Sequence, residues 1–306
     1  MKILVTGANG LLGQTLVRQL TERGYEVVAT GRGVSRLIIA AMERCSYQSI
    51  DITNGVQLQE LIAAEKPEVI VHAAAMTQVD YCEEHKQECY NLNVTATRFL
   101  IDATKEINAR LIYVSTDFVF DGTSGPYAED AEPSPVNYYG STKFAAEKAV
   151  MESGLEWAIA RTILVYGFVP STGRQNIISW VKQSLEESKI IRVVIDQYRT
   201  PTFVEDLARG VLLMIEKKAR GIYHLSGEQV MTPYEMAVET ARFFGLNESL
   251  IEKTGSAEFK QSGTRPLKTG FNIAKAKKDL GFQPLSFEDG LQNMFIGQPQ
   301  QNKNEE

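Results

Sequence analysis

The sequence predicts an α/β fold in which a doubly wound parallel sheet is followed by a smaller C-terminal lobe. Short apolar segments alternate with longer amphipathic segments over residues 1–165, and this alternation is typical of parallel strands joined by helices. The chain has 306 residues, about twice the usual length of one domain. Hydrophobic residues make up 43% and charged residues 23%, so the composition is that of a globular protein with a sizeable core.

The first half of the chain shows the alternation most clearly. Apolar runs rich in valine, isoleucine and alanine predict strands over residues 3–5, 26–29, 69–71, 111–114 and 158–160. Helical spacing of apolar residues predicts helices over residues 11–22, 56–64, 83–106 and 139–152. Stop signals follow three of these helices, at Gly24, Pro67 and Gly154.

The pattern loosens after residue 165. Helices are expected over residues 177–185, 204–215 and 233–244, and strands over 190–194 and 222–225. No linker rich in glycine, serine or proline separates the two halves, so later strands can extend the first sheet. We therefore predict a nucleotide-type α/β domain over residues 1–165, a smaller lobe mainly over 166–297, and a flexible polar tail over 298–306.

Composition excludes several classes of partner. The 32 basic residues are outnumbered by 38 acidic ones, for a net charge of −6, so we expect no nucleic-acid partner. No apolar run approaches the ~20 residues of a membrane helix, so no membrane partner is expected. The chain starts directly with a strand, and Cys45, Cys82 and Cys89 lack the spacing of a metal site. We predict a cytoplasmic protein without a metal, and leave open whether it forms a homodimer.

The first predicted strand leads into a glycine-rich loop that opens a helix. Gly7, Gly10 and Gly13 have the spacing Gly-x-x-Gly-x-x-Gly, and Leu11 and Leu12 begin the helix. Glycines permit a tight turn, let backbone N–H groups approach a pyrophosphate, and bring the positive helix N-terminus to the phosphates. The loop therefore predicts a Rossmann-type dinucleotide site, with a purely structural turn as the alternative.

The second predicted strand indicates which dinucleotide is bound. No carboxylate follows it, although a site for NAD usually has one against the ribose 2′-hydroxyl. Arg32, with Ser35 and Arg36 nearby, can bind a 2′-phosphate and so favours NADP(H); a solvated arginine is the alternative. Asp51 can accept a hydrogen bond from the adenine amino group or cap the next helix, and it is placed with Ile52 in the cofactor site.

Of the twelve tyrosines, only Tyr139 has a lysine four positions later, Lys143. This spacing puts both side chains on one helix face, where an ammonium group can lower the pKa of the phenol and make it a proton donor. An unremarkable surface pair is the alternative. At the end of the strand over 111–114, we prefer Thr116 to Ser115 as the hydroxyl that orients a substrate oxygen. Asp117 is interpreted as a turn or helix-cap residue.

Several segments together resemble the extended short-chain dehydrogenase/reductase family. They are the glycine loop over residues 6–13, His-Ala-Ala-Ala over 72–75, Ser-Thr-Asp-Phe-Val-Phe-Asp-Gly over 115–122 and Tyr-Gly-Ser-Thr-Lys over 139–143. The resemblance covers nearly the whole chain. Within that family, residues 77–80, 196–197, 201–202 and 265–266 resemble the dTDP-4-dehydrorhamnose reductases most.

The resemblance implies roles for individual residues. It implies Thr116, Tyr139 and Lys143 as the catalytic triad, with Asn93 continuing the proton path through water. It further implies a cofactor site lined by Ala73, Ala74, Ala75, Asn93, Ser115, Thr162 and Ile163, besides Tyr139 and Lys143. The sugar-nucleotide pocket would include Thr77, Val79, Thr116, Phe118, Leu164, Asn176 and Arg265. Leu164 stands where the reductases have a tryptophan, which bears on the sugar that is bound.

Three functions follow from the resemblance. The first is NADPH-dependent reduction of the C4 ketone of a nucleotide-linked 4-keto-6-deoxy sugar, dTDP-4-dehydrorhamnose above all. A sugar-nucleotide epimerase or dehydratase would keep NAD bound, and the missing carboxylate near Arg32 argues against it. Residues 221–266 also resemble the regulatory β subunit of methionine adenosyltransferase, which binds NADP and serves a protein partner. The complete triad favours the reductase.

The remaining histidines and cysteines receive structural interpretations. His72 closes a predicted strand and His224 lies within one, where histidines are more often hydrogen-bonded core residues than bases. Cys82 and Cys89 are seven positions apart on a predicted helix and are interpreted as small buried side chains.

Overall fold

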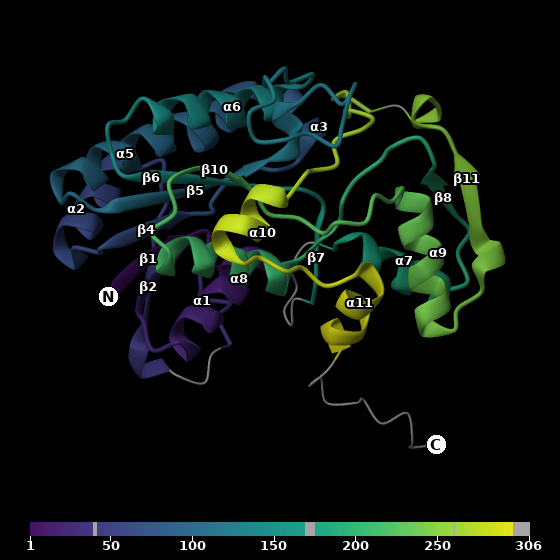
Figure 1. Cartoon of the computed structure of the whole chain (residues 1–306), viewed down its shortest axis with the longest axis horizontal. Coiled ribbons are helices and arrows are strands. Elements are labelled where there is room, and N and C mark those ends of the chain that lie inside the picture. The colour runs from purple at the N-terminus through teal and green to yellow at the C-terminus, as the bar shows by residue number, and fades with distance from the viewer. Residues whose placement is uncertain (39–41, 169–174, 260, 296–306) are drawn as a thin grey trace.

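The computed structural model describes residues 1–38, 42–168, 175–259 and 261–295 (Figure 1). The polar tail predicted over residues 298–306 lies outside these ranges. Within them, no helix combines the length and the apolar character that crossing a membrane would require.

A seven-stranded parallel sheet forms the centre of the fold. Its strand order is β10-β6-β5-β4-β1-β2-β3, and every neighbouring pair is parallel. From β1 the chain moves outward to β2 and β3, returns to β4 on the other side, and continues to β5 and β6, which is a doubly wound arrangement. The predicted fold class is confirmed. The strands are β1 (Lys2–Thr6), β2 (Glu26–Gly31), β3 (Cys45–Ser49), β4 (Val69–His72), β5 (Arg110–Thr116), β6 (Trp157–Thr162) and β10 (Gly221–His224).

Helices cover both faces of the sheet, as a parallel sheet requires. In Figure 1, α5 (Ala96–Glu106) and α6 (Tyr138–Met151) lie above the strands and α2 (Gly55–Glu65) lies at their left, while α1 (Leu11–Glu22) and α8 (Val204–Glu216) lie below. Each face has its own apolar core: Leu16, Val17 and Leu20 of α1 belong to one, and Leu58 and Ile62 of α2 belong to the other. Because both faces of the sheet are buried, the sequence of each central strand is a continuous apolar run.

The single helix predicted over residues 83–106 is wrong. The segment instead forms α3 (Val79–Glu84), α4 (Lys86–Tyr90), a π-helical turn (Asn91–Thr95) and α5. The π turn contains the buried Asn93, whose Oδ1 accepts a hydrogen bond from Met76 N at 2.8 Å and whose Nδ2 donates to Thr142 Oγ1 at 3.0 Å. The spacing of apolar residues does not predict such a turn, because the contacts that accompany it are polar and involve residues far away in the chain.

The second half of the chain returns to the large sheet before it completes the smaller lobe. β10 pairs with β6 at the sheet edge, so a later strand extends the first sheet as expected. In the lobe, β8 (Ile191–Val194) pairs in parallel with β11 (Ile251–Thr254), and α7 (Ile177–Glu186) and α9 (Pro233–Phe244) pack on them. A short parallel pair, β7 (Val165–Tyr166) with β9 (Thr202–Phe203), leads into α8.

The sequence did not predict several short elements. Besides β3, β7, β9 and β11, these are α10 (Ala274–Leu280), α11 (Phe287–Phe295) and four 3₁₀ turns, at Met42–Arg44, Asp117–Val119, Glu248–Leu250 and Ser256–Glu258. Each is short, so it carries too few residues to show a periodicity. The longer elements were predicted closely, and α1 and α9 have the predicted bounds.

A buried ion pair joins α6 to β6. Arg161 donates from Nε to Glu147 Oε1 at 2.9 Å and from Nη2 to Oε2 at 2.7 Å, and the two side chains are 1% and 0% exposed. The guanidinium also lies over the Phe120 ring, 5.1 Å from its centroid. Breaking such a pair leaves an uncompensated charge in the interior.

Glu147→Gln is therefore expected to lower the free energy of unfolding by about 3–5 kcal/mol, since it leaves the Arg161 charge without a counter-charge. Urea denaturation followed by circular dichroism measures the loss. Glu156→Gln is the matched control, because it breaks an exposed pair with Arg220, worth less than about 1 kcal/mol. Equal losses in the two variants would contradict the expectation.

Candidate active site

The turn between β1 and α1 is shaped by glycine. Gly7 has φ +72°, and a Cβ on it would lie 2.8 Å from Ala74 N. A Cβ on Gly13 would overlap the Gly7 carbonyl oxygen. Gly10 is the N-cap of α1 and no side chain caps this helix end, so no side chain is hydrogen-bonded to its first N–H groups. This geometry fits a pyrophosphate at the positive end of a helix.

Asn9 connects this turn to the loop that follows β2. Its Nδ2 donates to the carbonyl groups of Arg32 at 3.1 Å and Val34 at 3.0 Å, and its Oδ1 accepts from Arg36 N at 2.9 Å. The sequence analysis missed Asn9, although its place inside the glycine loop was a signal. The Arg32 and Ser35 side chains are exposed beside this loop, where a basic side chain can meet a phosphate.

Asp51 lies at the same edge, but it does not cap a helix. Its Oδ1 accepts from Thr53 N at 3.0 Å and from Thr53 Oγ1 at 2.8 Å, and the backbone hydrogen bond from Thr53 is the main reason that its pKa is lowered. The N-cap of α2 is Asn54. The capping alternative for Asp51 is therefore wrong, and Ile52 beside it is buried.

His72 closes β4 as a structural residue. Its Nδ1 lies 2.7 Å from Thr6 Oγ1 and its Nε2 lies 3.0 Å from Thr97 Oγ1. Burial lowers its pKa to about 3, so the ring is neutral and the structural interpretation is confirmed. Thr6 Oγ1 also accepts from Ala74 N at 3.2 Å. This bond holds the loop that contains Ala73, Ala74 and Ala75 against the glycine turn.

Thr116, Tyr139 and Lys143 come together beyond the carboxyl end of β5. Lys143 Nζ donates to Val114 O at 2.8 Å and lies 4.1 Å from the centroid of the Tyr113 ring. The Tyr139 ring lies edge-on to that of Phe118, with centroids 5.8 Å apart. The Tyr139 side chain is 7% exposed and that of Lys143 2%, so the cluster is nearly closed to solvent and electrostatic effects within it are strong.

Burial determines the ionisation of the cluster. It raises the pKa of Tyr139 above its ordinary value, and the hydrogen bond with Thr116 opposes this shift. It lowers the pKa of Lys143 to about 7, against the charge of Glu147. The net shift of the Tyr139 pKa is upward, because desolvation is its largest cause, and the lowering by Lys143 stays a prediction. Both shifts have the sign of desolvation, which disfavours the charged form of either group.

Buried polar groups surround the three residues. Asn93 Nδ2 donates to Cys89 Sγ at 3.4 Å, and Cys89, Cys82 and Tyr139 share one apolar cluster. The cysteines are buried, as interpreted, but they lie on α3 and α4 and not on one helix. Among the residues that the structure describes, no group of three or more His, Cys, Asp or Glu side chains could hold a metal ion.

The residues predicted for the cofactor beyond β5 and β6 lie at the same edge of the sheet. Ser115 is buried and its Oγ has no hydrogen-bond partner within the protein. Thr162 Oγ1 donates to Thr202 Oγ1 at 3.3 Å. Ile163 is buried, and Leu164, 36% exposed, has φ +38°.

The residues predicted for the sugar nucleotide come from several separate elements. Arg265 donates from Nη1 and Nη2 to the two carboxylate oxygens of Asp80, at 2.6 Å each, and this bond is the main cause that lowers the pKa of Asp80 to about 2. Val79 precedes that aspartate, Thr77 is exposed nearby in the chain, and Phe118 lies edge-on to Tyr139 with centroids 5.8 Å apart. Asn176 instead caps α7, accepting from Ile178 N and Ser179 N.

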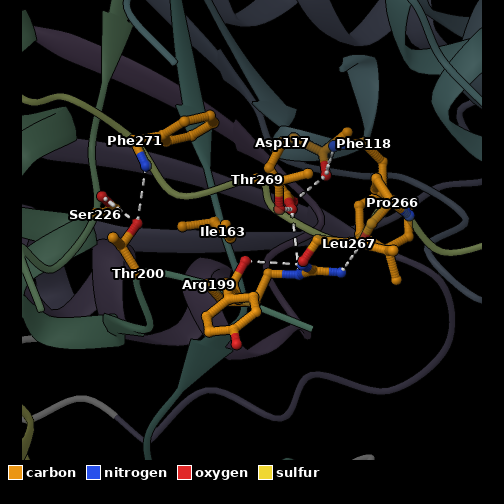
Figure 2. Close-up of polar contacts among 12 residues, drawn as sticks. Asp117, Phe118, Ile163, Arg199, Thr200, Ser226, Pro266, Leu267, Thr269 and Phe271 are labelled. Carbon is orange, nitrogen blue, oxygen red and sulfur yellow. Dashed lines mark hydrogen bonds and ion pairs between the residues drawn. The ribbon is translucent and has the colours of Figure 1, made fainter. Parts of the chain in front are cut away.

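Asp117 begins a 3₁₀ turn, as interpreted, and its side chain does not cap that turn. Thr116 caps the 3₁₀ turn over Asp117–Val119 by accepting from Phe118 N at 3.3 Å. The Asp117 carboxylate is buried and ion-paired with Arg199, and it accepts a hydrogen bond from Thr269 (Figure 2). Sequence reasoning missed Arg199 and Thr269, because each lies far along the chain from Asp117 and neither stands in a chemical motif.

His224 is also a structural residue. Its ring stacks on Phe271 with centroids 3.9 Å apart, and its Nδ1 lies 3.2 Å from Tyr127 O. Burial lowers its pKa to about 3, so it is neutral near pH 7 and the structural interpretation is confirmed.

Residues 1–298 match the model of the RmlD substrate-binding domain family, and the chain belongs to this family. It is 35% identical to methionine adenosyltransferase 2 subunit beta of Xenopus tropicalis over 81% of this chain and 73% of that one. It is 30% identical to dTDP-4-dehydrorhamnose reductase of Aggregatibacter actinomycetemcomitans over 96% and 98% of the two chains. The solved structure of dTDP-4-dehydrorhamnose reductase from Bacillus anthracis in complex with NADP is similar with a TM-score of 0.85, at 29% identity, covering 96% and 98%. The resemblance to extended short-chain dehydrogenases/reductases is confirmed.

The buried Lys143 is expected to make stability depend on pH. Its pKa is about 7 in the folded protein and 10.5 ordinarily, so between these values the unfolded chain binds one more proton and stability rises with pH. Below about pH 7 both states hold the proton, and the contribution is constant. We expect the unfolding free energy of wild type, relative to Lys143→Met, to rise by up to about 4 kcal/mol between about pH 7 and about pH 10.

Urea denaturation at a series of pH values measures this difference. Lys148→Met is the matched control, because Lys148 is on the same helix and exposed, so its removal should leave the pH profile of wild type unchanged. A flat difference between wild type and Lys143→Met would show that the ammonium group is not desolvated.

Proposed function

We propose that this protein is an NADPH-dependent reductase of a nucleotide-linked 4-keto-6-deoxy sugar, and that it reduces dTDP-4-dehydrorhamnose to dTDP-L-rhamnose. The observation that carries the proposal is the buried cluster of Thr116, Tyr139 and Lys143 at the same edge of the parallel sheet as the glycine turn. A turn that fits a dinucleotide, next to a proton-holding phenol, is the arrangement that carbonyl reduction needs. The likeness to dTDP-4-dehydrorhamnose reductases over nearly the whole chain supports the choice of substrate.

NADP(H) is the proposed cofactor, and when bound it supplies the hydride. Uncapped N–H groups at the start of α1 would hold the pyrophosphate, and Arg32 would bind the 2′-phosphate. The cofactor site would further include Gly7, Gly10, Leu11, Leu12, Gly13, Ser35, Asp51, Ile52, Ala73, Ala74, Ala75, Asn93, Ser115, Thr162 and Ile163.

Tyr139 is proposed to donate the proton to the carbonyl oxygen. Since burial raises its pKa, the phenol keeps its proton near pH 7, which is the form needed for reduction. Lys143, with a pKa of about 7, can both gain and lose a proton at that pH and so can restore the proton of Tyr139. Asn93 donates a hydrogen bond to Thr142, the residue before Lys143 on α6. Asn93 would continue this proton path through water.

Thr116 is proposed to orient the substrate carbonyl, and the remaining pocket to select the sugar nucleotide. Arg265, held in a bidentate pair by Asp80, would contact the nucleotide part. Leu164 stands in place of an aromatic residue that would contact the sugar. A single change of this kind alters the discrimination between two sugars by about 1–3 kcal/mol. Thr77, Val79, Phe118 and Asn176 complete the proposed pocket.

A second candidate function is that of a non-catalytic regulatory subunit. It is supported by the 35% identity to a protein named as the β subunit of methionine adenosyltransferase 2. Copurification with an adenosyltransferase, without turnover of any keto-sugar nucleotide, would favour this function. The sugar-nucleotide epimerase or dehydratase has less support, because the described loop after β2 has Arg32 where a carboxylate would bind NAD.

Tyr139→Phe is expected to lower kcat about 10²- to 10⁴-fold, because it removes the proposed proton donor. NADPH oxidation with dTDP-4-dehydrorhamnose, followed by absorbance, measures the rate, and fluorescence measures NADPH binding, which should persist. Tyr138→Phe is the matched control, since its hydroxyl is one residue away and has no proposed role. An unchanged rate in Tyr139→Phe would refute the mechanism, and NADPH binding without reduction by wild type would refute the reductase assignment.

Arg32→Ala is expected to weaken NADPH binding about 10-fold, because it removes a charge-assisted contact with the 2′-phosphate. NADH lacks this phosphate, so its affinity should not change. Fluorescence titration with both cofactors makes the comparison. Arg44→Ala serves as a control, since Arg44 binds the Gly24 carbonyl before the start of β2. An equal change for NADPH and NADH would contradict the role of Arg32.

A further inference from the structure

The Thr116 hydroxyl is hydrogen-bonded to one member of a buried ion pair, Asp117 with Arg199. Arg199 is 4% exposed and Asp117 3%, and Arg199 Nε lies 3.7 Å from Asp117 Oδ2. Figure 2 shows the guanidinium below the carboxylate, with Pro266 and Leu267 beside it. Since replacing a buried ion pair by apolar residues is often neutral or stabilising, stability alone does not account for these two charges.

The remaining donors of Arg199 are engaged by backbone carbonyl groups. Nη1 donates to Tyr198 O at 2.8 Å and to Leu267 O at 3.0 Å, and Nη2 donates to Pro266 O at 2.6 Å. A planar guanidinium makes these bonds with one edge while Nε stays directed at the carboxylate. The side chain is therefore fixed, and it also fixes the segment that follows Arg265.

Asp117 in turn fixes the Thr116 side chain. Thr116 Oγ1 donates to Asp117 Oδ1 at 3.1 Å and accepts from Phe118 N at 3.3 Å. These two bonds hold Oγ1 in one rotamer. Thr269 Oγ1 donates to the other carboxylate oxygen, Oδ2. The carboxylate is thus held from two sides, by Thr269 and by Arg199.

We propose that Arg199 is a positioning residue, which through Asp117 sets the orientation of the Thr116 side chain in the reductase site. The proposal rests on the proposed function, in which Thr116 orients the substrate carbonyl. Without the guanidinium, a carboxylate that is 3% exposed would lose its counter-charge and take up a proton more readily. A neutral carboxyl group can turn and donate a hydrogen bond itself, so Thr116 would lose the contact that fixes its rotamer.

Three variants separate positioning from general stability. Arg199→Met removes the guanidinium and keeps an unbranched side chain, and Arg199→Lys keeps the positive charge. Arg110→Met is the matched control, because Arg110 is also buried, begins β5, and donates to the backbone carbonyls of Met214 and Ala219. It lies at the opposite end of β5 from Thr116, so it shares the structural role of Arg199 without its link to the site.

Initial rates of NADPH-dependent reduction of dTDP-4-dehydrorhamnose at saturating substrate give kcat. We expect Arg199→Met to lower kcat about 10- to 100-fold, Arg199→Lys to recover part of this loss, and Arg110→Met to keep the wild-type value. Because Arg199 acts through Thr116, the double variant Thr116→Val/Arg199→Met should lose no more than Thr116→Val alone. Losses that multiply, or a wild-type kcat in Arg199→Met, would overturn the proposal.

Crystal structures of Arg199→Met and Arg110→Met provide a test that does not depend on activity. We expect the χ1 angle of Thr116 to change in Arg199→Met and to stay unchanged in Arg110→Met. An unchanged χ1 angle in Arg199→Met would overturn the proposal. A wild-type protein without turnover would contradict the proposed function, and the χ1 comparison would then decide the positioning role by itself.

Discussion

The close approach of the β1–α1 turn to the loop after β4 is the constraint on which the rest of the site depends. Gly7 adopts φ +72°, and even a Cβ at this position would come within 2.8 Å of Ala74 N. The approach exists because β1 pairs with both β2 and β4, so the chain leaves β1 in one direction and later returns on the other side. A doubly wound sheet opens a crevice at this point, beyond the carboxyl ends of its strands.

Burial of both sheet faces then decides the chemistry at that edge. The strands end in polar residues such as His72, Ser115 and Thr116, which the two helical layers cover almost completely. In this environment the neutral forms of ionisable groups are favoured, so Tyr139 keeps its proton at pH 7 and the pKa of Lys143 is lowered to about 7. The same desolvation makes His72 a neutral hydrogen-bonding partner of Thr6 and Thr97.

Two buried ion pairs join segments that lie apart in the sequence. Arg161 and Glu147 connect β6 to α6. Arg199 and Asp117 connect the end of β5 to the entry into β9 and, through Pro266, to the C-terminal part of the chain. Buried pairs of this kind contribute little net stability, but they fix the mutual positions of the segments that carry the proposed triad and pocket.

The sequence by itself determined the features that depend on neighbouring residues. The glycine spacing of the first loop, the four-residue separation of Tyr139 and Lys143, and the bounds of α1 and α9 follow from local backbone geometry and helical periodicity. Only the tertiary structure decided the π turn around Asn93, the pairing of Arg199 with Asp117 and that of Arg265 with Asp80. These depend on contacts between residues far apart in the chain, and on desolvation, which no local pattern of residues encodes.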